Sequence, residues 1–171
     1  VVALMGPNGS GKSTFSRLLC GLDTPSEGTI ILDETPCNKE RLERSVGYMF
    51  QNPDYQIFLP QVKDELSYSL SFLKINEKEK EKRLSETAAL FSLSLSDTAS
   101  LMSYGERKRL QSAIYYSLDR PFYILDELDS ALTYKESISI LEKLSQNGAG
   151  ILLITHDDDF ASAVADRGYR A

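Results

Sequence analysis

Residues 6–14 read GPNGSGKST and directly follow an apolar run, VVALM, at residues 1–5. The stretch fits the pattern G-x-x-x-x-G-K-[ST], and it lies between an expected strand and an expected helix at residues 12–22. Its glycines permit backbone conformations that turn successive N–H groups inward, which creates a nest for an anion. The stretch therefore predicts a loop, called the P-loop below, that binds a nucleoside triphosphate.

The polar residues of this loop have distinct expected roles. Lys12 supplies a full positive charge for the β- and γ-phosphates, and the Ser13 hydroxyl is placed to coordinate Mg²⁺. The helix that follows adds the positive end of its dipole. The residues expected to bind the nucleotide are Gly6, Pro7, Asn8, Gly9, Ser10, Gly11, Lys12, Ser13 and Thr14.

The composition is that of a globular protein of ordinary domain size. The chain has 171 residues, of which 42% are hydrophobic and 26% charged, so a packed core is expected. A net charge of -6 argues against electrostatic binding to nucleic acid, and no nucleic-acid partner is expected. Cys20 and Cys37 have no metal-like spacing and are interpreted as reduced thiols of a cytosolic protein.

Short apolar runs alternate with helical patterns along most of the chain, which predicts a mostly parallel sheet with helices on both faces. Strands are expected at 1–5, 28–33, 46–50, 122–126, 150–155 and 168–171, and helices at 12–22, 106–118, 134–147 and 159–165. Between them, Leu-rich periodicity predicts only helices, at 62–73 and 76–93. The predicted fold is an α/β P-loop NTPase core, at 1–51 and 103–171, with an inserted helical subdomain at 52–102.

Two carboxylates and two other polar side chains are expected at the carboxyl ends of strands. In residues 122–127, FYILDE, Asp126 is expected to hold the Mg²⁺ shell from a strand beside the P-loop strand. Glu127 is placed to polarise a water for attack on the γ-phosphate. Without the P-loop, the pair would equally suit a solvated acidic turn. His156, the only histidine, and Gln51 follow other strands, at the edge where α/β sheets bind ligands.

In this order, the motifs resemble the nucleotide-binding subunit of ABC transporters. MSYGE at 102–106 matches the family signature, usually written LSGGQ, imperfectly and about twenty residues before the Walker B strand. ILDELDSALT at 124–133 resembles the Walker B and D-loop run, and ITHDDD at 154–159 looks like the switch-histidine segment. ADRGYR at 165–170 is similar to the segment that usually follows. The resemblance covers nearly the whole chain.

The segment at 48–66, YMFQNPDYQIFLPQVKDEL, narrows the resemblance. It looks like the Q-loop of energy-coupling-factor and cobalt-type import ATPases, in which Gln-Asn-Pro-Asp-x-Gln-x-Phe recurs. The residues at the matching positions are Asn52, Pro53, Asp54, Gln56 and Phe58. The resemblance therefore implies an ATPase that powers an importer for a vitamin or a metal ion.

The resemblance also implies a mechanism in which two ATPase subunits close head to tail on ATP. Ser103 and Gly105 would contact the nucleotide held by the P-loop of the other subunit. Glu127 would act as the base, His156 would hold the γ-phosphate, and Gln51 would touch Mg²⁺ and the attacking water. The implied cofactors are ATP and Mg²⁺, and the implied metal ligands are Ser13, Gln51 and Asp126.

The implied partners are a second ABC ATPase subunit, identical or different, and an integral membrane transporter subunit. The helical insert at 52–102 would dock the coupling helices of the membrane subunit. The protein would then lie at the cytoplasmic face of the cell membrane as a peripheral protein.

Several positions depart from the family pattern. Tyr104 stands where the signature usually has Gly, and Glu106 replaces the common Gln, so a working but weakened signature is expected. In the D-loop, Leu128 and Asp129 replace the usual Pro and Thr, and Thr133 replaces Asp. These D-loop changes predict a subunit that works best in an asymmetric pair with a different ATPase.

The opening of the sequence inside an apolar strand suggests a fragment that lacks the family's N-terminal antiparallel strands and its adenine-stacking aromatic, and hence weak ATP binding by residues 1–171. Three other functions remain open. They are an ABC-superfamily ATPase that moves no solute, a P-loop kinase for a small molecule, and a regulatory subunit that does not hydrolyse ATP.

Overall fold

The computed structural model describes all residues from 1 to 171, and the chain divides into two compact units. The first unit comprises Val1–Tyr48, Arg120–Asp129 and Ser145–Ala171, and the second comprises Met49–Asp119 and Ser130–Leu144. The predicted helical subdomain at 52–102 lies wholly within the second unit.

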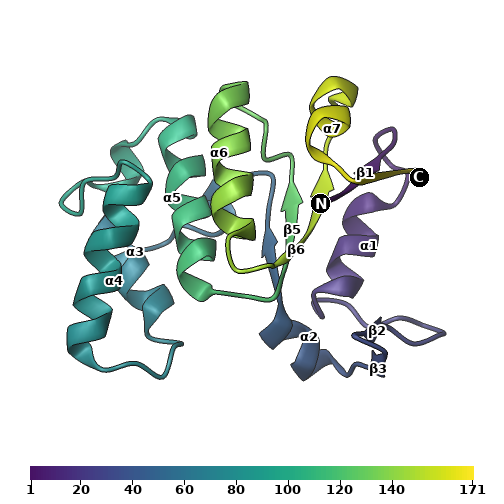
Figure 1. Ribbon diagram of the computed structural model, residues 1–171, viewed down its shortest axis with the longest axis horizontal. Coiled ribbons are helices and arrows are strands. Elements are labelled where there is room, and N and C mark those ends of the chain that lie inside the picture. The colour runs from purple at the N-terminus through teal and green to yellow at the C-terminus, as the bar shows by residue number, and fades with distance from the viewer. The chain divides into compact units, whose positions relative to one another are not determined.

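The first unit contains a five-stranded sheet in the order β4-β5-β6-β1-β7 (Figure 1). Its strands are β1 Val2–Met5, β4 Val46–Met49, β5 Phe122–Asp126, β6 Gly150–Ile154 and β7 Arg167–Arg170. Strand β1 pairs in parallel with β6 and β7, and β5 pairs in parallel with β6. Ala3, Leu125 and Leu153 are fully buried in this sheet. The prediction of a mostly parallel sheet is confirmed.

The prediction that β5 lies beside the P-loop strand, β1, was wrong. Strand β6 lies between β5 and β1, with Leu152 in register with Ile124 on one side and with Val2 on the other. The sequence GILLI is apolar throughout, which suits a strand buried between two others. Strand spacing then places the end of β5 roughly 10 Å from the end of β1 in the plane of the sheet. Both strands still end at the same edge.

Short helices and a small hairpin complete the first unit. The helices are α1 Lys12–Leu19, α2 Lys39–Ser45 and α7 Asp158–Val164. The strand expected at 28–33 is reduced to β2, Ile31–Leu32, which pairs antiparallel with β3, Thr35–Pro36. Helix α2 was not predicted. Its start is capped by the side chain of Asn38, which accepts the N–H of Arg41, and its only buried residue is Leu42.

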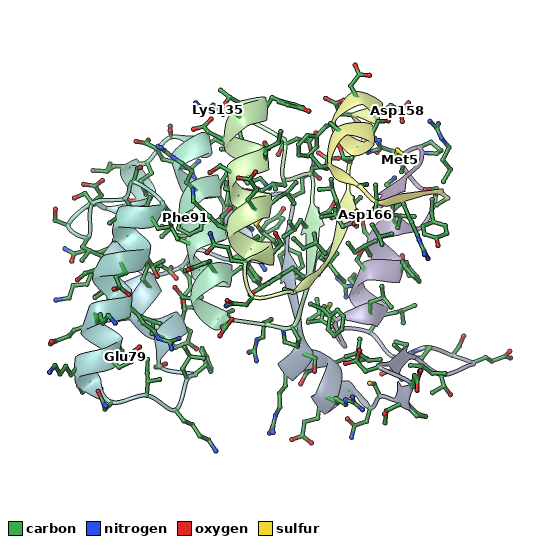
Figure 2. All side chains as sticks on the ribbon, viewed as in Figure 1. Met5, Glu79, Phe91, Lys135, Asp158 and Asp166 are labelled. Atoms are coloured by element: carbon green, nitrogen blue, oxygen red, sulfur yellow. The ribbon has the colours of Figure 1, made fainter.

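The second unit is helical. Its main helices are α3 Val62–Leu70, α4 Glu77–Leu90, α5 Tyr104–Leu118 and α6 Tyr134–Ser145, with short 3-10 helices η1 Pro53–Tyr55 and η2 Ala99–Leu101. Helices α3, α4 and α5 pack against one another around Leu66, Leu84 and Leu110. Phe91 is buried against Tyr116, whereas charged side chains such as Glu79 lie at the surface (Figure 2). No helix in the chain is long and apolar enough to cross a membrane.

Candidate functional site

The P-loop joins the end of β1 to the start of α1 within the first unit. Gly9 and Gly11 have φ angles of 84° and 94°. Residues with a Cβ rarely adopt this left-handed region. Gly11 is the residue that precedes the first turn of α1. The loop is closed by a bond from the Ser10 N–H to the Pro7 carbonyl, at 3.3 Å. The predicted strand–loop–helix arrangement is therefore present.

The polar groups of the loop suit a phosphate chain. The Lys12 ammonium donates to the carbonyls of Gly6 and Pro7, at 2.8 and 2.9 Å, so the side chain folds over the loop. The hydroxyl of Ser10 is buried and has no hydrogen-bond partner. Buried polar groups are normally paired, so an unpaired hydroxyl in this loop fits a site that an anion completes.

Two oxygen donors at the same sheet edge suit Mg²⁺, which prefers hard oxygen ligands and usually combines one or two carboxylates with phosphate oxygens. Ser13 is exposed in the first turn of α1, and the half-buried carboxylate of Asp126 ends β5. The residues present therefore fit the metal that the sequence predicts. The third predicted ligand, Gln51, belongs to the second unit.

Glu127 is in an uncommon backbone conformation directly after Asp126. Its φ of 47° lies in the left-handed region, which costs a residue with a side chain about 1–3 kcal/mol. The turn is held by a bond from the Glu127 N–H to the carbonyl of Ile154, at 2.9 Å, and by the fully buried side chain of Leu128. The residue predicted to be the base is therefore one of the strained positions of the chain.

The structure brings the predicted base and the predicted switch histidine together. Nε2 of His156 lies 3.3 Å from Oε1 of Glu127. The exposed fractions of the two side chains are 42% and 23%, so both are accessible from solvent. Because β5 and β6 are adjacent and parallel, the residues that follow their ends must lie side by side. A carboxylate and an imidazole at this distance can share a proton.

A second contact links the ends of the same two strands, and sequence reasoning missed it. The hydroxyl of Thr155 donates to Oδ2 of Asp129, at 3.0 Å, and accepts the N–H of Asp157 at the same distance. Thr155 is fully buried, and Oδ1 of Asp129 is buried without a partner. The unusual Asp129 thus ties the start of the D-loop to the residue before His156. The only sequence signal for the role of Thr155 was its position between an apolar strand and His156.

In the second unit, the signature forms the start of α5. Ser103 Oγ accepts the N–H of Glu106 at 3.3 Å, and Oε2 of Glu106 accepts the backbone N–H and the hydroxyl of Ser103 at 2.8 and 2.6 Å. This reciprocal capping box satisfies two donors at the helix start. The Ser103 hydroxyl, and after it the Ser103 N–H, lowers the pKa of the Glu106 carboxyl. Glu106, unexplained by the sequence, therefore has a structural role.

Tyr104 also has a partner within its own unit. Its hydroxyl donates to the backbone carbonyl of Gln51, at 3.0 Å, which ties the signature to the Q-loop. Gly105 was expected to precede a helix, but it lies in the first turn of α5, because Ser103 is the capping residue. A Cβ on Gly105 would lie 2.9 Å from the carbonyl oxygen of Ala131, so this position needs glycine for packing inside the chain.

The Q-loop is held by buried polar side chains of α5. Nε2 of Gln111 and Nζ of Lys108 donate to the carbonyl of Phe50, at 3.0 and 3.3 Å. Oε1 of Gln56 accepts the Phe50 N–H at 3.0 Å and a second bond from Gln111. Lys108 and Gln111 are fully buried, and sequence reasoning did not identify them. Their i, i+3 spacing around Leu110 predicted their burial only weakly, because polar and charged residues on helices usually face water.

The remaining Q-loop residues stabilise the turn that follows. The Asn52 side chain accepts the N–H of Asp54 at 2.9 Å and so caps η1, with Pro53 in its first turn. The Asp54 carboxylate pairs with Nε of Arg107 at 2.8 Å. Asn52, Pro53, Asp54 and Gln56 therefore shape the loop, whereas the matching aromatic, Phe58, is 66% exposed.

Thr133 keeps a capping function at the end of the D-loop. Oε2 of Glu136 accepts the Thr133 N–H at 2.9 Å and the Thr133 hydroxyl at 2.7 Å, and Thr133 Oγ1 accepts the Glu136 N–H at 3.3 Å. Thr133 thus caps α6 as an Asp would. The family departure at this position leaves the local helix start intact.

Comparisons with known sequences identify the family of the chain. A family model described as ABC transporter matches residues 1–130. The energy-coupling factor transporter ATP-binding protein EcfA1 of Thermotoga maritima is 36% identical over 166 residues, which cover 94% of this chain and 63% of that protein. A putative ABC transporter ATP-binding protein of Pyrococcus horikoshii is 33% identical over 175 residues, or 97% of this chain and 67% of that protein. The chain therefore spans about two thirds of the length of these relatives.

Solved structures show the same fold. CbiO1 of Clostridium perfringens, part of an ABC transporter complex named cbiONQ, superposes with a TM-score of 0.85 at 27% identity, over 99% of this chain and 72% of that one. An ATP-binding cassette in a dimeric post-hydrolysis state, bound to ADP and phosphate, gives a TM-score of 0.79 at 25% identity, over 94% of this chain and 76% of that one. With a family model over most of its length and relatives above 30% identity, the chain belongs to the ABC transporter family of ATP-binding domains.

Proposed function

We propose that the whole protein binds and hydrolyses ATP as a subunit of an ABC importer of the energy-coupling-factor type, which takes up a vitamin or a metal ion. The observation that carries the hydrolytic part is the 3.3 Å contact between Glu127 and His156, at the sheet edge that also carries the P-loop. The importer part is supported by the similarity to EcfA1 and CbiO1.

In the proposed reaction, each residue acts where its strand or helix places it. Lys12 exchanges its bonds to loop carbonyls for bonds to β- and γ-phosphate oxygens. Ser13 and Asp126, with Gln51 as the third proposed ligand, would hold Mg²⁺, which when bound would neutralise charge on the phosphates. Glu127 accepts a proton from the attacking water, and His156 donates a hydrogen bond to the γ-phosphate.

The signature is proposed to serve a second ATPase subunit, identical or different. Ser103 and the N-terminus of α5 would face the γ-phosphate held by the P-loop of that subunit, because helix N-termini favour anions. The Ser103 hydroxyl donates to Glu106, so nucleotide binding requires this proton to turn toward the phosphate. A weakly hydrolysing subunit in an asymmetric pair is the second candidate, and this bond favours it.

The helical subdomain at 52–102 is proposed to dock an integral membrane subunit. Phe58, Tyr68 and Phe72 form an exposed aromatic row, with exposed fractions of 66%, 48% and 59%. Their rings contact edge to face, with centroids 5.5 and 5.2 Å apart. Contiguous exposed apolar side chains mark interaction surfaces, and a coupling helix with an apolar face would cover this row. The protein would then lie at the cytoplasmic face of the membrane.

The test is to purify the full-length protein from membranes of its own host and to identify the bound proteins by mass spectrometry. A small integral membrane protein together with a second ATPase supports the importer. A matched preparation of a Phe58→Asp and Phe72→Asp double variant should lose the membrane protein but keep ATP binding. Recovery with ribosomes or DNA instead would replace the importer with an ABC ATPase that moves no solute.

A further inference from the structure

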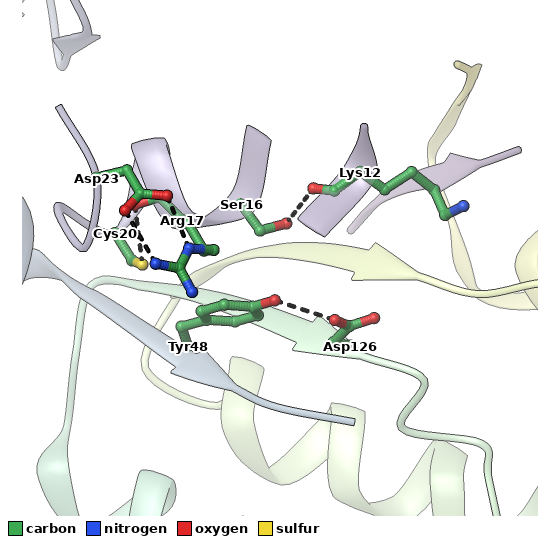
Figure 3. Close-up of polar contacts among 7 residues, drawn as sticks. All are labelled: Lys12, Ser16, Arg17, Cys20, Asp23, Tyr48 and Asp126. Atoms are coloured by element: carbon green, nitrogen blue, oxygen red, sulfur yellow. Dashed lines mark hydrogen bonds and ion pairs between the residues drawn. The ribbon is translucent and has the colours of Figure 1, made fainter. Parts of the chain in front are cut away.

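Tyr48 lies on β4, next to β5 in the sheet, and begins the segment 48–66 without being one of its residues at matching positions. Only 7% of its surface is exposed. Its hydroxyl donates to Oδ2 of Asp126 at 3.0 Å (Figure 3). A buried hydroxyl bonded to a carboxylate is a strong, directional contact, because one partner is charged and water is excluded. The tyrosine therefore restricts how the Asp126 side chain can rotate.

The same hydroxyl lies close to the helix that carries the P-loop lysine. Ser16, which is fully buried on α1, donates to the Lys12 carbonyl at 2.9 Å. Figure 3 shows these groups between α1 and the end of β5.

We propose that Tyr48 is a positioning residue that orients Asp126 for the Mg²⁺ that accompanies ATP. The inference rests on the proposed function. A carboxylate held through one oxygen has a fixed plane, and groups that hold a metal ligand in this way typically change metal affinity 10–100-fold when removed. Tyr48 thereby limits the positions that the Asp126 carboxylate can take at the end of β5.

The experiment compares Tyr48→Phe with the unchanged full-length protein. The variant keeps the ring and removes only the hydroxyl. Mn²⁺ binding in the presence of a non-hydrolysable ATP analogue is followed by electron paramagnetic resonance, and analogue binding in EDTA by calorimetry. We expect metal affinity to fall about 10–100-fold while metal-free nucleotide affinity stays unchanged.

Tyr123→Phe is the matched control. Tyr123 is equally buried, at 3% exposure, and lies on β5, but its hydroxyl accepts the N–H of Arg120. This control should leave the Mn²⁺ affinity unchanged. Equal losses of metal affinity in both variants, or parallel losses of metal and metal-free nucleotide affinity in Tyr48→Phe, would assign Tyr48 to packing alone. Failure of the unchanged protein to bind the analogue would instead reject the proposed function.

Discussion

Glu127 combines a reactive position with a strained backbone. Its left-handed conformation aims the carboxylate toward His156 instead of along the axis of β5, and the bond to Ile154 keeps it there. Glycine would relieve the strain but would remove the carboxylate. The cost of about 1–3 kcal/mol is therefore retained at a residue whose carboxylate the proposed chemistry requires.

Replacing Glu127 by Gln should separate hydrolysis from nucleotide binding. The amide keeps the shape but accepts no proton, so ATP turnover should fall about 100- to 10,000-fold. ATP-driven dimerisation should persist, because the P-loop is unchanged. Phosphate release and light scattering of the full-length protein measure the two effects. Glu86→Gln, at an exposed residue paired only with Lys82, is the control, and unchanged turnover in Glu127→Gln would remove Glu127 from the mechanism.

At the scale of elements, the capping box of α5 makes the signature sensitive to acid. The pKa of Glu106 is lowered in the folded chain, so the folded state binds this proton more weakly than the unfolded state. The stabilisation is complete above the unfolded pKa of about 4.3 and is lost as the pH falls through the lowered pKa. Urea unfolding between pH 6 and pH 3 (roughly this window) should show a larger loss in the unchanged chain than in Glu106→Gln, because other carboxyls with a lowered pKa, such as Glu136, titrate in both. Identical pH profiles would contradict the assignment.

The loop before α3 depends on one buried carboxylate. Oε1 of Glu65 accepts the N–H groups of both Phe58 and Leu59, and Glu65 is only 2% exposed. Glu65→Leu removes the acceptor of two part-buried N–H groups and should lower the free energy of unfolding by roughly 1–3 kcal/mol. Glu65→Gln keeps an oxygen in place and should cost less. Chemical denaturation of both variants measures the difference, and equal losses would argue against this contact.

Helices and loops with a strong local sequence pattern were predicted correctly, and those without one were missed or misplaced. The P-loop was predicted from its motif, and α3 and α4 from their apolar spacing, and the structure contains all three. Helix α2 was missed because Leu42 is its only buried residue, which leaves no periodic face to detect. The start of α5 was placed too late because glycine disfavours helices, whereas the Ser103 cap and the close carbonyl of Ala131 decide the position.

At the scale of the whole molecule, strand order was the main error. Nothing in the residues of β5 distinguishes β1 from β6 as its neighbour, because both are short and apolar. The carboxyl-edge placement of Asp126, Glu127 and His156 was nevertheless predictable, since parallel strands end at one edge in any order. The bonds of Tyr48, Lys108 and Asp129 were not, because they join residues far apart in sequence.

The departures from the family pattern affect how this subunit pairs with a second ATPase. Tyr104, Glu106 and Asp129 each engage a group of their own chain in place of the common family residue. We expect the full-length protein alone to hydrolyse ATP at least about tenfold more slowly than when mixed with a different ATPase of the same transporter, about 1.4 kcal/mol in barrier. Phosphate release from the separate and mixed proteins measures this. Normal turnover by the protein alone would contradict it.

The close approach of Gly105 to the Ala131 carbonyl has a genetic consequence. A methyl group at 105 cannot fit at 2.9 Å unless the backbone at 131 moves, so one mutation disturbs two motifs about 25 positions apart in the chain. Suppressors of Gly105→Ala should therefore arise in the D-loop before they arise near the nucleotide. Ala131→Gly is the expected first suppressor, because Ala131 has a φ of 61° and glycine would let that carbonyl turn away.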